Sequence, residues 1–420
     1  MPASSLEVLK TAINYGADAV YIGGEMYGLR AKAKNFSAED MQEGIRFAHQ
    51  HGKKVYVTAN ITAHSRDMAG VRTYFSELKS WGDARPDAVI VSDLGVFQIA
   101  KETVYPEIEI HVSTQANTTN YVAANFWYEQ GASRVVPARE LSLDEITTLR
   151  ANIPADMEIE CFIHGAMCMS YSGRCLLSNF FTGRDANLGA CTHPCRWKYY
   201  LMEETRPGEY HPVFENDRGT YIFNSKDLCM IEYIPEMVKA GIDSFKIEGR
   251  MKTALYVASV ARTYRQAIDD FITSEELYYK NIPHYKEEIA KCTYRQFITG
   301  FYFGRTNEDS QIYDNNTYVK EYTYLGLIQG KNEKGLYAIE QRNKFSVGDT
   351  IEVMKPNGDN IAVKVHHIED EAGNEMESCP HPKQKIYLDL GLELSDFDLL
   401  RRKEEPKDSN CSCGSGSCGC

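Results

Sequence analysis

Short apolar runs alternate with longer amphipathic stretches from residue 5 to about residue 275. The short runs are rich in β-branched residues, as strands are, and the longer stretches repeat their apolar positions at helical spacing. Strands are predicted at 19–24, 54–59, 88–92, 108–113, 134–138, 158–164, 221–224 and 244–248. Helices are predicted between them, for example at 38–51, 69–81, 143–151 and 254–271. This alternation predicts parallel strands joined by helical crossovers.

Two α/β architectures share this alternation, a β/α barrel and an open doubly wound sheet. Eight regularly spaced units within about 270 residues match the size of a barrel better. We therefore predict an α/β fold with a TIM-like barrel over residues 1–310. Because functional residues of such barrels lie at the carboxyl ends of the strands, the residues after each strand are the first candidates.

The pattern changes after residue 310 to shorter alternating segments. Strands are predicted at 322–328, 336–340, 350–354, 362–368 and 385–390, with turn signals such as Pro-Asn-Gly-Asp at 356–359 between them. We predict a small all-β barrel domain over residues 311–402. Residues 403–420 are rich in Gly, Ser and Cys and are predicted to form a flexible tail.

Composition narrows the classes of function. The chain has 46 basic and 59 acidic residues, a net charge of −13, so an RNA contact is expected to be local. No stretch approaches the length of apolar sequence that crosses a membrane, and no membrane partner is expected. The first residues lack the basic and apolar regions of a signal peptide, which favours a cytoplasmic location.

Twelve cysteines are the most informative feature of the composition. Cytoplasmic thiols stay reduced, so a cluster of them indicates metal binding or catalysis before disulfides. Six lie within seventy residues, after the end of a predicted strand: Cys161, Cys168, Cys175, Cys191, Cys195 and Cys229. Four thiolates suit either a 4Fe-4S cluster or structural zinc. The C-x2-C knuckles of zinc ribbons are absent here, which favours iron-sulfur only modestly.

Burial in a core is the alternative role for any of these thiols, because free cysteine is among the most buried residue types. We prefer that role for Cys161, which lies within a predicted strand, and for Cys292 and Cys379. The loop cysteines are more consistent with metal binding as a set.

Several blocks of the chain together resemble a known family. They lie at 15–24, 164–197, 225–229, 244–252, 299–304 and 340–349, and include Ser-Lys-Asp-Leu-Cys and Ser-Phe-Lys-Ile-Glu-Gly-Arg-Met-Lys. The chain is similar to the collagenase-like U-32 peptidase family, in particular to its bacterial members that synthesise 5-hydroxyuridine in tRNA. The resemblance covers nearly the whole chain.

The resemblance implies an iron-sulfur protein of tRNA modification. Such proteins hydroxylate the wobble uridine without O2, with prephenate as the source of the hydroxyl group. Matched position by position, the family's ligands of the 4Fe-4S cluster fall on Cys168, Cys175, Cys191 and Cys229, with Cys195 as a competing ligand. Expected partners are tRNA, a small-molecule carboxylate and a homologous member of the family.

The start of the chain departs from the family. Members begin with an apolar strand and an Ala-Pro-Ala-Gly-like turn, whereas this chain starts at Met1-Pro2-Ala3. The first strand of the barrel is therefore expected to be missing, and a misassigned start codon would explain its absence. An open position there would leave neighbouring strands without ladder partners.

Charged and polar residues near the strand ends are the remaining candidates. A dicarboxylate such as prephenate calls for Arg or Lys side chains. The substrate-binding candidates are Arg139, Arg174, Lys226, Arg250 and Gln115. The candidates for proton transfer are His164, Glu140 and Glu248. For each of them an ordinary ion pair, solvated charge or satisfied hydrogen bond is the alternative reading.

Two other classes of function stay open. A collagenase-like peptidase is suggested by the family name, but the chain has no His-Glu-x-x-His helix and no Gly-x-Ser-x-Gly elbow. A catalytic cysteine would keep its activity after removal of iron, which separates the two ideas. A non-enzymatic scaffold would support modification only when a partner protein is present.

Overall fold

The computed structural model describes most of the chain. It covers residues 1–28, 36–168, 171, 175–184, 186, 191, 192, 194–196, 198, 199, 215, 216, 219–221, 226–304 and 319–404. Two compact units are present, Met1–Ala290 with Tyr294–Val319, and Lys291–Thr293 with Lys320–Cys420. The predicted boundary at 310 falls within 305–318, outside the described residues. In the part of the chain that is described, no helix is long and apolar enough to span a membrane.

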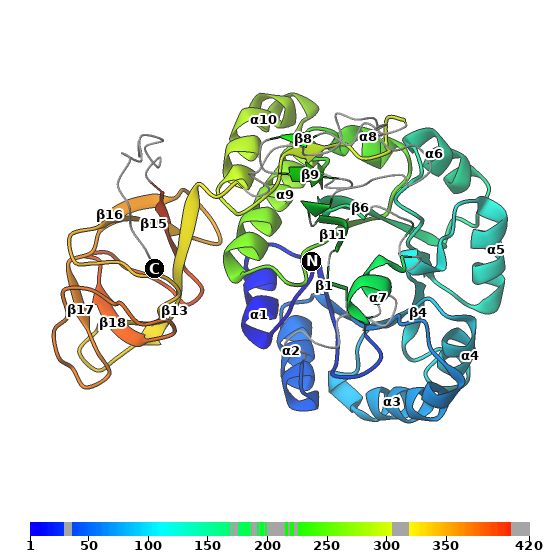
Figure 1. Cartoon of the computed structure of the whole chain (residues 1–420), viewed down its shortest axis with the longest axis horizontal. Helices are drawn as coiled ribbons and strands as arrows, with labels where there is room; N and C mark the ends of the chain where they lie inside the picture. Colours follow the sequence, from blue (N-terminus) through cyan, green and yellow to red (C-terminus); the bar gives the residue numbers. More distant parts are fainter. Residues whose placement is uncertain are drawn as a thin grey trace. The chain divides into compact units, whose positions relative to one another are not determined.

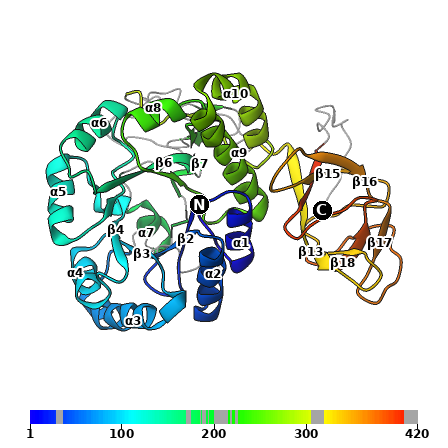
Figure 2. The same cartoon turned by 180° about the vertical axis from the view of Figure 1, so that it is seen from behind.

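The first unit is built on a sheet of parallel strands in sequence order. These strands are β1 (Ala19–Ile22), β2 (Lys54–Ala59), β3 (Ala88–Val91), β4 (Glu109–Val112), β5 (Arg134–Val135), β6 (Glu158–Ala166) and β11 (Ser244–Ile247). Each strand from β1 to β6 pairs in parallel with the next, and β11 pairs in parallel with β6. Helices form a ring around the strands (Figures 1 and 2). The predicted β/α barrel is confirmed.

The helices are α1 (Leu6–Asn14), α2 (Ala38–Gln50), α3 (Met68–Ser80), α4 (Leu94–Thr103), α5 (Tyr121–Gln130), α6 (Leu143–Ala151), α7 (Leu177–Thr182), α8 (Ile234–Lys239), α9 (Ala254–Thr273) and α10 (Glu275–Ala290). Helices α1, α2, α4, α5 and α6 begin at a residue whose side chain caps the helix. Ser5 accepts a hydrogen bond from the Val8 N–H at the start of α1. Ser142 and Glu145 form a reciprocal capping box at α6. Both arrangements satisfy N–H groups that a helix end leaves unpaired.

Residues 1–3 lie beside β1 at the position expected to be empty. The Met1 amine donates to the Ala19 carbonyl at 2.7 Å, and Pro2 forms a parallel bridge with Tyr21. Residues 1–3 thus pair with β1 through an isolated bridge and are not part of a strand. Of the strand predicted at 221–224, residues 222–224 lie outside the described residues, and Tyr221 pairs with Lys198 in a separate small sheet and not in the barrel.

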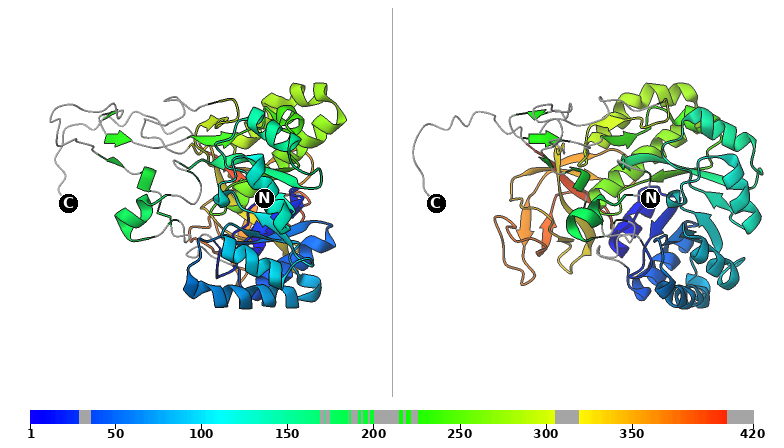
Figure 3. Two further views of the ribbon diagram at one scale, coloured as in Figure 1. Left: turned by 90° about the vertical axis from the view of Figure 1, so that its right-hand side faces the viewer. Right: turned by 45° about the vertical axis from the view of Figure 1, so that its right-hand side comes forward.

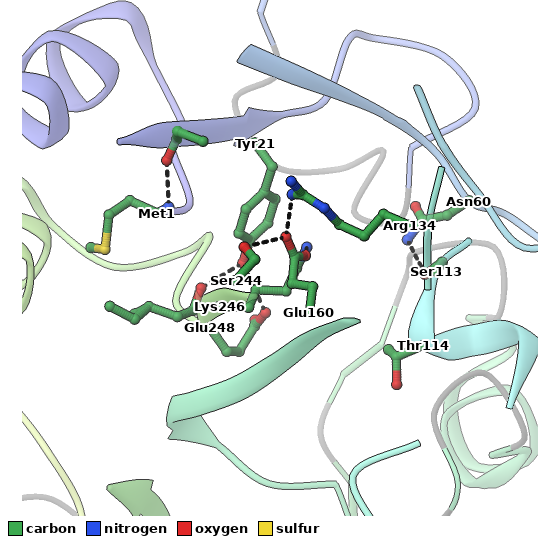
Figure 4. Close-up of polar contacts among 12 residues, drawn as sticks. Met1, Tyr21, Asn60, Ser113, Thr114, Arg134, Glu160, Ser244, Lys246 and Glu248 are labelled. Carbon is green, nitrogen blue, oxygen red and sulfur yellow. Dashed lines mark hydrogen bonds and ion pairs between the residues drawn. The ribbon is translucent and has the colours of Figure 1, made fainter. Parts of the chain in front are cut away.

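An ionic network fills part of the barrel interior. Glu160 accepts hydrogen bonds from Arg134 (Nη1–Oε2 2.8 Å), from Ser244 (2.9 Å) and from Lys246, as Figure 4 shows. The Arg134 and Lys246 cations also lie over the rings of Tyr56 and Tyr21, respectively, at 5.1 and 4.5 Å. Burial opposes ionisation of Glu160, but Lys246 and Arg134 outweigh it and hold the carboxyl pKa well below its usual range.

The chain after β6 leaves the regular barrel pattern. Strand β10 (Asp227–Cys229) pairs with the end of β6 in the antiparallel direction, and β12 (Phe297–Ile298) pairs with β10. Strands β7 (Lys198–Tyr199), β9 (Gly219–Tyr221) and β8 (Glu215–Asn216) form a separate sheet in that order. Helix α7 and this small sheet project from the same end of the barrel (Figure 3).

The second unit is a curled antiparallel sheet. Its strands are β13 (Tyr322–Lys331), β14 (Tyr337–Glu340), β15 (Thr350–Met354), β16 (Ile361–Lys364), β17 (His367–Glu369), β18 (Lys385–Asp389) and β19 (Leu399–Lys403), in the order β16-β15-β19-β13-β14-β18-β17. The end strands β16 and β17 are consecutive in the chain, and the sheet is curled into a half-barrel. Buried Leu325, Phe345 and Leu388 belong to its core. Sequence analysis missed β19, which ends in a charged run.

The first prediction concerns the ionic network. Replacing Glu160 with Gln leaves the buried Lys246 without its carboxylate, so we expect a loss of about 3–5 kcal/mol in the free energy of unfolding. Glu158→Gln is the matched control, because Glu158 contacts the same Arg134 but its side chain is 45% exposed. We expect that control to cost no more than about 1 kcal/mol. Urea unfolding checks both, and equal losses would contradict a dominant role for Glu160.

The second prediction concerns Gly165, where β6 passes the end of β11. Its φ is +110°, and a Cβ there would lie 2.4 Å from the Glu248 carbonyl oxygen. We expect Gly165→Ala to cost about 2–5 kcal/mol, from the left-handed conformation and the backbone clash together. Gly52→Ala is the control, with φ +67° and open space around its Cβ. It should cost only about 1–2 kcal/mol in the same unfolding measurement.

Candidate active site at the barrel mouth

Polar side chains from several strands meet at the carboxyl end of the barrel, which we call the mouth. They lie on the loops that follow β2, β4, β5, β6 and β11, and they are Asn60, Ser113, Gln115, Arg139, Glu140, Cys168, Glu248 and Arg250. This end of a β/α barrel is where catalytic residues are found. The candidates predicted from strand ends, other than His164 and those on undescribed segments, therefore share one region.

Arg250 is held in a fixed position by β1 and β2. Its guanidinium is 8% exposed, and Nη1 donates to the Thr58 hydroxyl at 3.2 Å. Thr58 in turn donates to the Ile22 carbonyl at 3.0 Å. A Cβ at Gly23 would lie 2.1 Å from Arg250 Nη2, so a larger residue there would displace the guanidinium from this position. Sequence analysis missed Thr58, although it is a polar residue in an otherwise apolar strand.

Glu248 is anchored where β11 ends. The Glu248 N–H donates to the His164 carbonyl at 2.8 Å, and the Glu248 carbonyl accepts from the Tyr256 hydroxyl at 2.7 Å. The Tyr21 hydroxyl lies 3.3 Å from Glu248 Oε2, as well as 2.9 Å from the Ile247 carbonyl. These contacts place a carboxylate in the same loop as Arg250.

Arg139 and Glu140 follow β5 on another side of the mouth. The Arg139 guanidinium lies over the Phe162 ring at 3.8 Å, and Nη1 donates to the Ala166 carbonyl at 3.0 Å. Burial raises the pKa of Glu140, although Arg139 opposes the shift. A carboxyl group with a raised pKa is suited to proton transfer closer to neutral pH.

Gln115 lies on the loop after β4 in a chain of hydrogen bonds. Its N–H donates to the Ser113 hydroxyl at 3.4 Å, and the Asn60 amide donates to the same hydroxyl at 3.3 Å (Figure 4). Sequence analysis missed Asn60 and Ser113, which are distinguished only by their position after strand ends. Lys226 is half-buried just before β10, and Arg174 lies outside the described residues.

His164 does not face the mouth. It is 1% exposed and its ring packs against Tyr256 and Tyr264 of α9 and Phe297 of β12, with Nδ1 3.4 Å from the Tyr264 hydroxyl. Burial lowers the pKa of His164 to about 4, so the ring is neutral at neutral pH. The pairing of β6 with β11 shifts register just before His164. Its environment suits a packing role better than proton transfer.

The candidate ligand cysteines range from exposed to partly exposed. Cys168 and Cys191 are exposed, while Cys175, Cys195 and Cys229 are partly exposed. The Ser178 hydroxyl accepts from the Thr192 N–H at 3.0 Å, which ties the segment after Cys175 to the residue after Cys191. As predicted, Cys161, Cys292 and Cys379 are buried.

The chemistry of this donor set fits thiolate-bound iron, since the four predicted ligands are cysteines on the chain that follows β6. Desolvation raises the pKa of Cys229 to about 11, so metal binding there would release a proton. Within the described ranges, however, no three Cys, His, Asp or Glu side chains are close enough to hold a metal.

A cavity of about 560 Å³ opens at the other end of the barrel. Strand starts line it, including Ala19, Lys54 and Ser244, and its charged lining includes Glu160 and Lys246. None of the predicted site residues is among its lining residues. The cavity and the mouth are therefore separate regions.

Proteins similar to this chain carry names from RNA modification. A "tRNA hydroxylation protein P1" of Bacillus subtilis is 40% identical, over 96% of this chain and 93% of the relative. A "tRNA hydroxylation protein P" of Escherichia coli is 38% identical, over 96% of this chain and 95% of the relative. A "23S rRNA 5-hydroxycytidine C2501 synthase" of Escherichia coli is 37% identical, over 64% of this chain and 39% of that protein.

Two family models match the two units of the chain. The model of peptidase family U32 matches residues 4–312, and the model of the U32 C-terminal domain matches residues 320–401. The resemblance expected from the sequence blocks is confirmed over nearly the full length. The chain belongs to peptidase family U32.

Proposed function

We propose that this chain is an RNA-modifying enzyme that hydroxylates tRNA. Relatives named for tRNA hydroxylation match over at least 93% of both chains, which supports an activity shared by the whole protein rather than by one domain. The geometry adds a mouth where Arg139, Glu140, Glu248 and Arg250 lie on loops after strand ends, with Cys168 on the loop after β6. That combination is the structural observation that carries the proposal.

The finer proposal is conversion of the wobble uridine to 5-hydroxyuridine, with prephenate as the hydroxyl donor. Replacing hydrogen by hydroxyl at C5 removes two electrons from the base, and the oxygen donor held next to it must take up both electrons as its own C–O bond breaks. Prephenate carries two carboxylates, which guanidinium groups bind with paired hydrogen bonds. Arg250 suits this role because its fixed position leaves little side-chain entropy to lose. Arg139, Lys226, Gln115 and Arg174 are further candidates.

A 4Fe-4S cluster would be held by Cys168, Cys175, Cys191 and Cys229, with Cys195 as a competing ligand. A bound cluster supplies one-electron redox chemistry at a site where the chain itself has none. The remaining work falls to side chains. Glu140 and Glu248 are the proposed groups for moving the C5 proton, and Glu140 is favoured because burial raises its pKa. His164 is a weaker candidate because it packs behind the mouth.

The third prediction tests the cluster and the reaction together. We expect anaerobically purified protein to absorb broadly near 400 nm with about four irons per chain. Cys168→Ala and Cys175→Ala should lose that absorption and, in cells lacking the native gene, the 5-hydroxyuridine found by mass spectrometry of tRNA nucleosides. Cys379→Ala is the control, because Cys379 is buried in the core of the second unit.

Colourless wild-type protein that carries zinc or no metal would contradict the iron-sulfur proposal. Cleavage of a collagen-derived peptide that survives iron removal would favour the peptidase. Modification that appears only when a homologous protein is added would favour the scaffold.

The fourth prediction concerns Arg250. Arg250→Lys keeps the charge but loses the paired donors and the bond to Thr58, so the KM for prephenate should rise about 10- to 100-fold. Arg265→Lys is the control, because Arg265 lies on helix α9, pairs with Asp18 and is not at the mouth. Initial rates of 5-hydroxyuridine formation against prephenate concentration check both. An unchanged KM in Arg250→Lys would remove Arg250 from donor binding.

A further inference from the structure

Two neighbouring loops of the mouth carry polar atoms that the folded chain leaves unpaired. Among the described residues, four buried atoms on the loops after β4 and β5 have no hydrogen-bond partner: Asn117 Oδ1, Thr118 Oγ1, Arg139 Nε and Glu140 Oε2. Burying a donor or acceptor without a partner costs free energy, so such atoms are rare in folded proteins. Four on two adjacent loops indicate that something outside the chain completes them.

The two loops are joined, so the four residues lie on one side of the mouth. The Ala138 N–H donates to the Thr118 carbonyl at 3.0 Å. The Thr114 hydroxyl donates to the Pro137 carbonyl at 3.1 Å. Thr118 itself is 2% exposed, whereas Asn117, Arg139 and Glu140 are partly exposed. These three residues therefore reach the surface at the mouth, although the four unpaired atoms themselves are buried.

The geometry also fixes which atoms are donors and which are acceptors. The Asn117 amide nitrogen donates to the Gln115 carbonyl at 3.0 Å, which identifies the unpaired atom as the amide oxygen, an acceptor. Asn117 has φ +53°, a strained conformation that is concentrated at functional sites. Arg139 is held by the Phe162 ring and the Ala166 carbonyl, which leaves its Nε–H as a free donor.

This set of atoms restricts the class of ligand. A phosphate or carboxylate offers only acceptors and cannot pair with the Asn117 oxygen. An ammonium group offers only donors and cannot pair with the Arg139 N–H. A planar edge with an N–H beside carbonyl oxygens pairs with both. The Watson–Crick edge of a uracil ring has this pattern, with N3–H between two carbonyls.

We propose that the loops after β4 and β5 form a subsite that binds the Watson–Crick edge of a pyrimidine base through Asn117, Thr118, Arg139 and Glu140. The choice of a pyrimidine as the ligand rests on the proposed function. The inference that the ligand has an N–H beside carbonyl oxygens rests on the unpaired atoms alone. A base held by this edge has C5 on the opposite side of the ring, open to reaction. Assigning Arg139 and Glu140 to this edge leaves Arg250 for the carboxylate of the oxygen donor and Glu248, in place of Glu140, for the C5 proton.

The fifth prediction uses two short single-stranded RNAs, one with a single uridine and one with 3-methyluridine in its place. Methylation removes the N3–H donor, so the full-length protein should bind the uridine RNA about 10-fold more tightly in calorimetric titration. Thr118→Val has nearly the same shape and should reduce this preference. It should also leave the melting temperature unchanged or raised, because it removes an unpaired hydroxyl.

Two variants make the test specific. Thr11→Val is the matched control, because the buried Thr11 hydroxyl is already paired with the Glu7 carbonyl at 2.8 Å. It should lower the melting temperature and leave the RNA preference intact. Asn117→Gly keeps the left-handed backbone without strain and removes the acceptor, so it should fold and lose the preference.

Equal binding of the two RNAs by wild type would overturn the subsite. The subsite would also be overturned if Thr118→Val were destabilised like Thr11→Val but bound RNA normally. A buried water, and not a base, would then be the hydrogen-bond partner of the unpaired atoms. Binding is measured without turnover. A clear uridine preference without hydroxylation would reject the proposed reaction and keep the subsite. Hydroxylation without the preference would reject the subsite and keep the proposed reaction.

Discussion

The buried carboxylate of Glu160 is the interaction on which the barrel depends. It lies between Arg134 of β5 and Lys246 of β11, so it links strands on both sides of β6. An unpaired charge in this position would carry a large desolvation cost, and the cost is met only when all three side chains are in place. The network therefore favours one relative placement of β5, β6 and β11.

The mouth is built directly on this network. The Phe162 ring is contacted by Lys246 at 5.7 Å and by Arg139 at 3.8 Å. One ring thus separates the ionic layer of the interior from the cations of the mouth. Since β11 also delivers Glu248 and Arg250, a shift of β11 would move the ionic layer and the candidate active site together. Stability and the proposed function are coupled through the same strands.

Local sequence pattern was sufficient for most of the barrel. Runs such as 54–59 are apolar on both faces, as buried parallel strands are, and the structure has strand β2 there with the same bounds. The pattern failed at Tyr221, the described residue of the run predicted at 221–224, because a short apolar run does not reveal whether it pairs with the barrel or with another segment. Phe162 and His164 are two residues apart in β6, but the pairing with β11 shifts register between them, and the His164 ring packs against α9.

The sequence by itself determined the parallel strand order, the family, and the position of Arg139, Glu140, Glu248 and Arg250 after strand ends. These properties depend on local periodicity and on chain order, which a linear sequence contains. Only the tertiary structure decided that Thr58 and Gly23 hold Arg250, that Ser178 ties the two thiol segments, and that Asn117 and Thr118 share a side of the mouth with Arg139. Such contacts join residues far apart in the chain, and no local pattern encodes which distant side chains will meet.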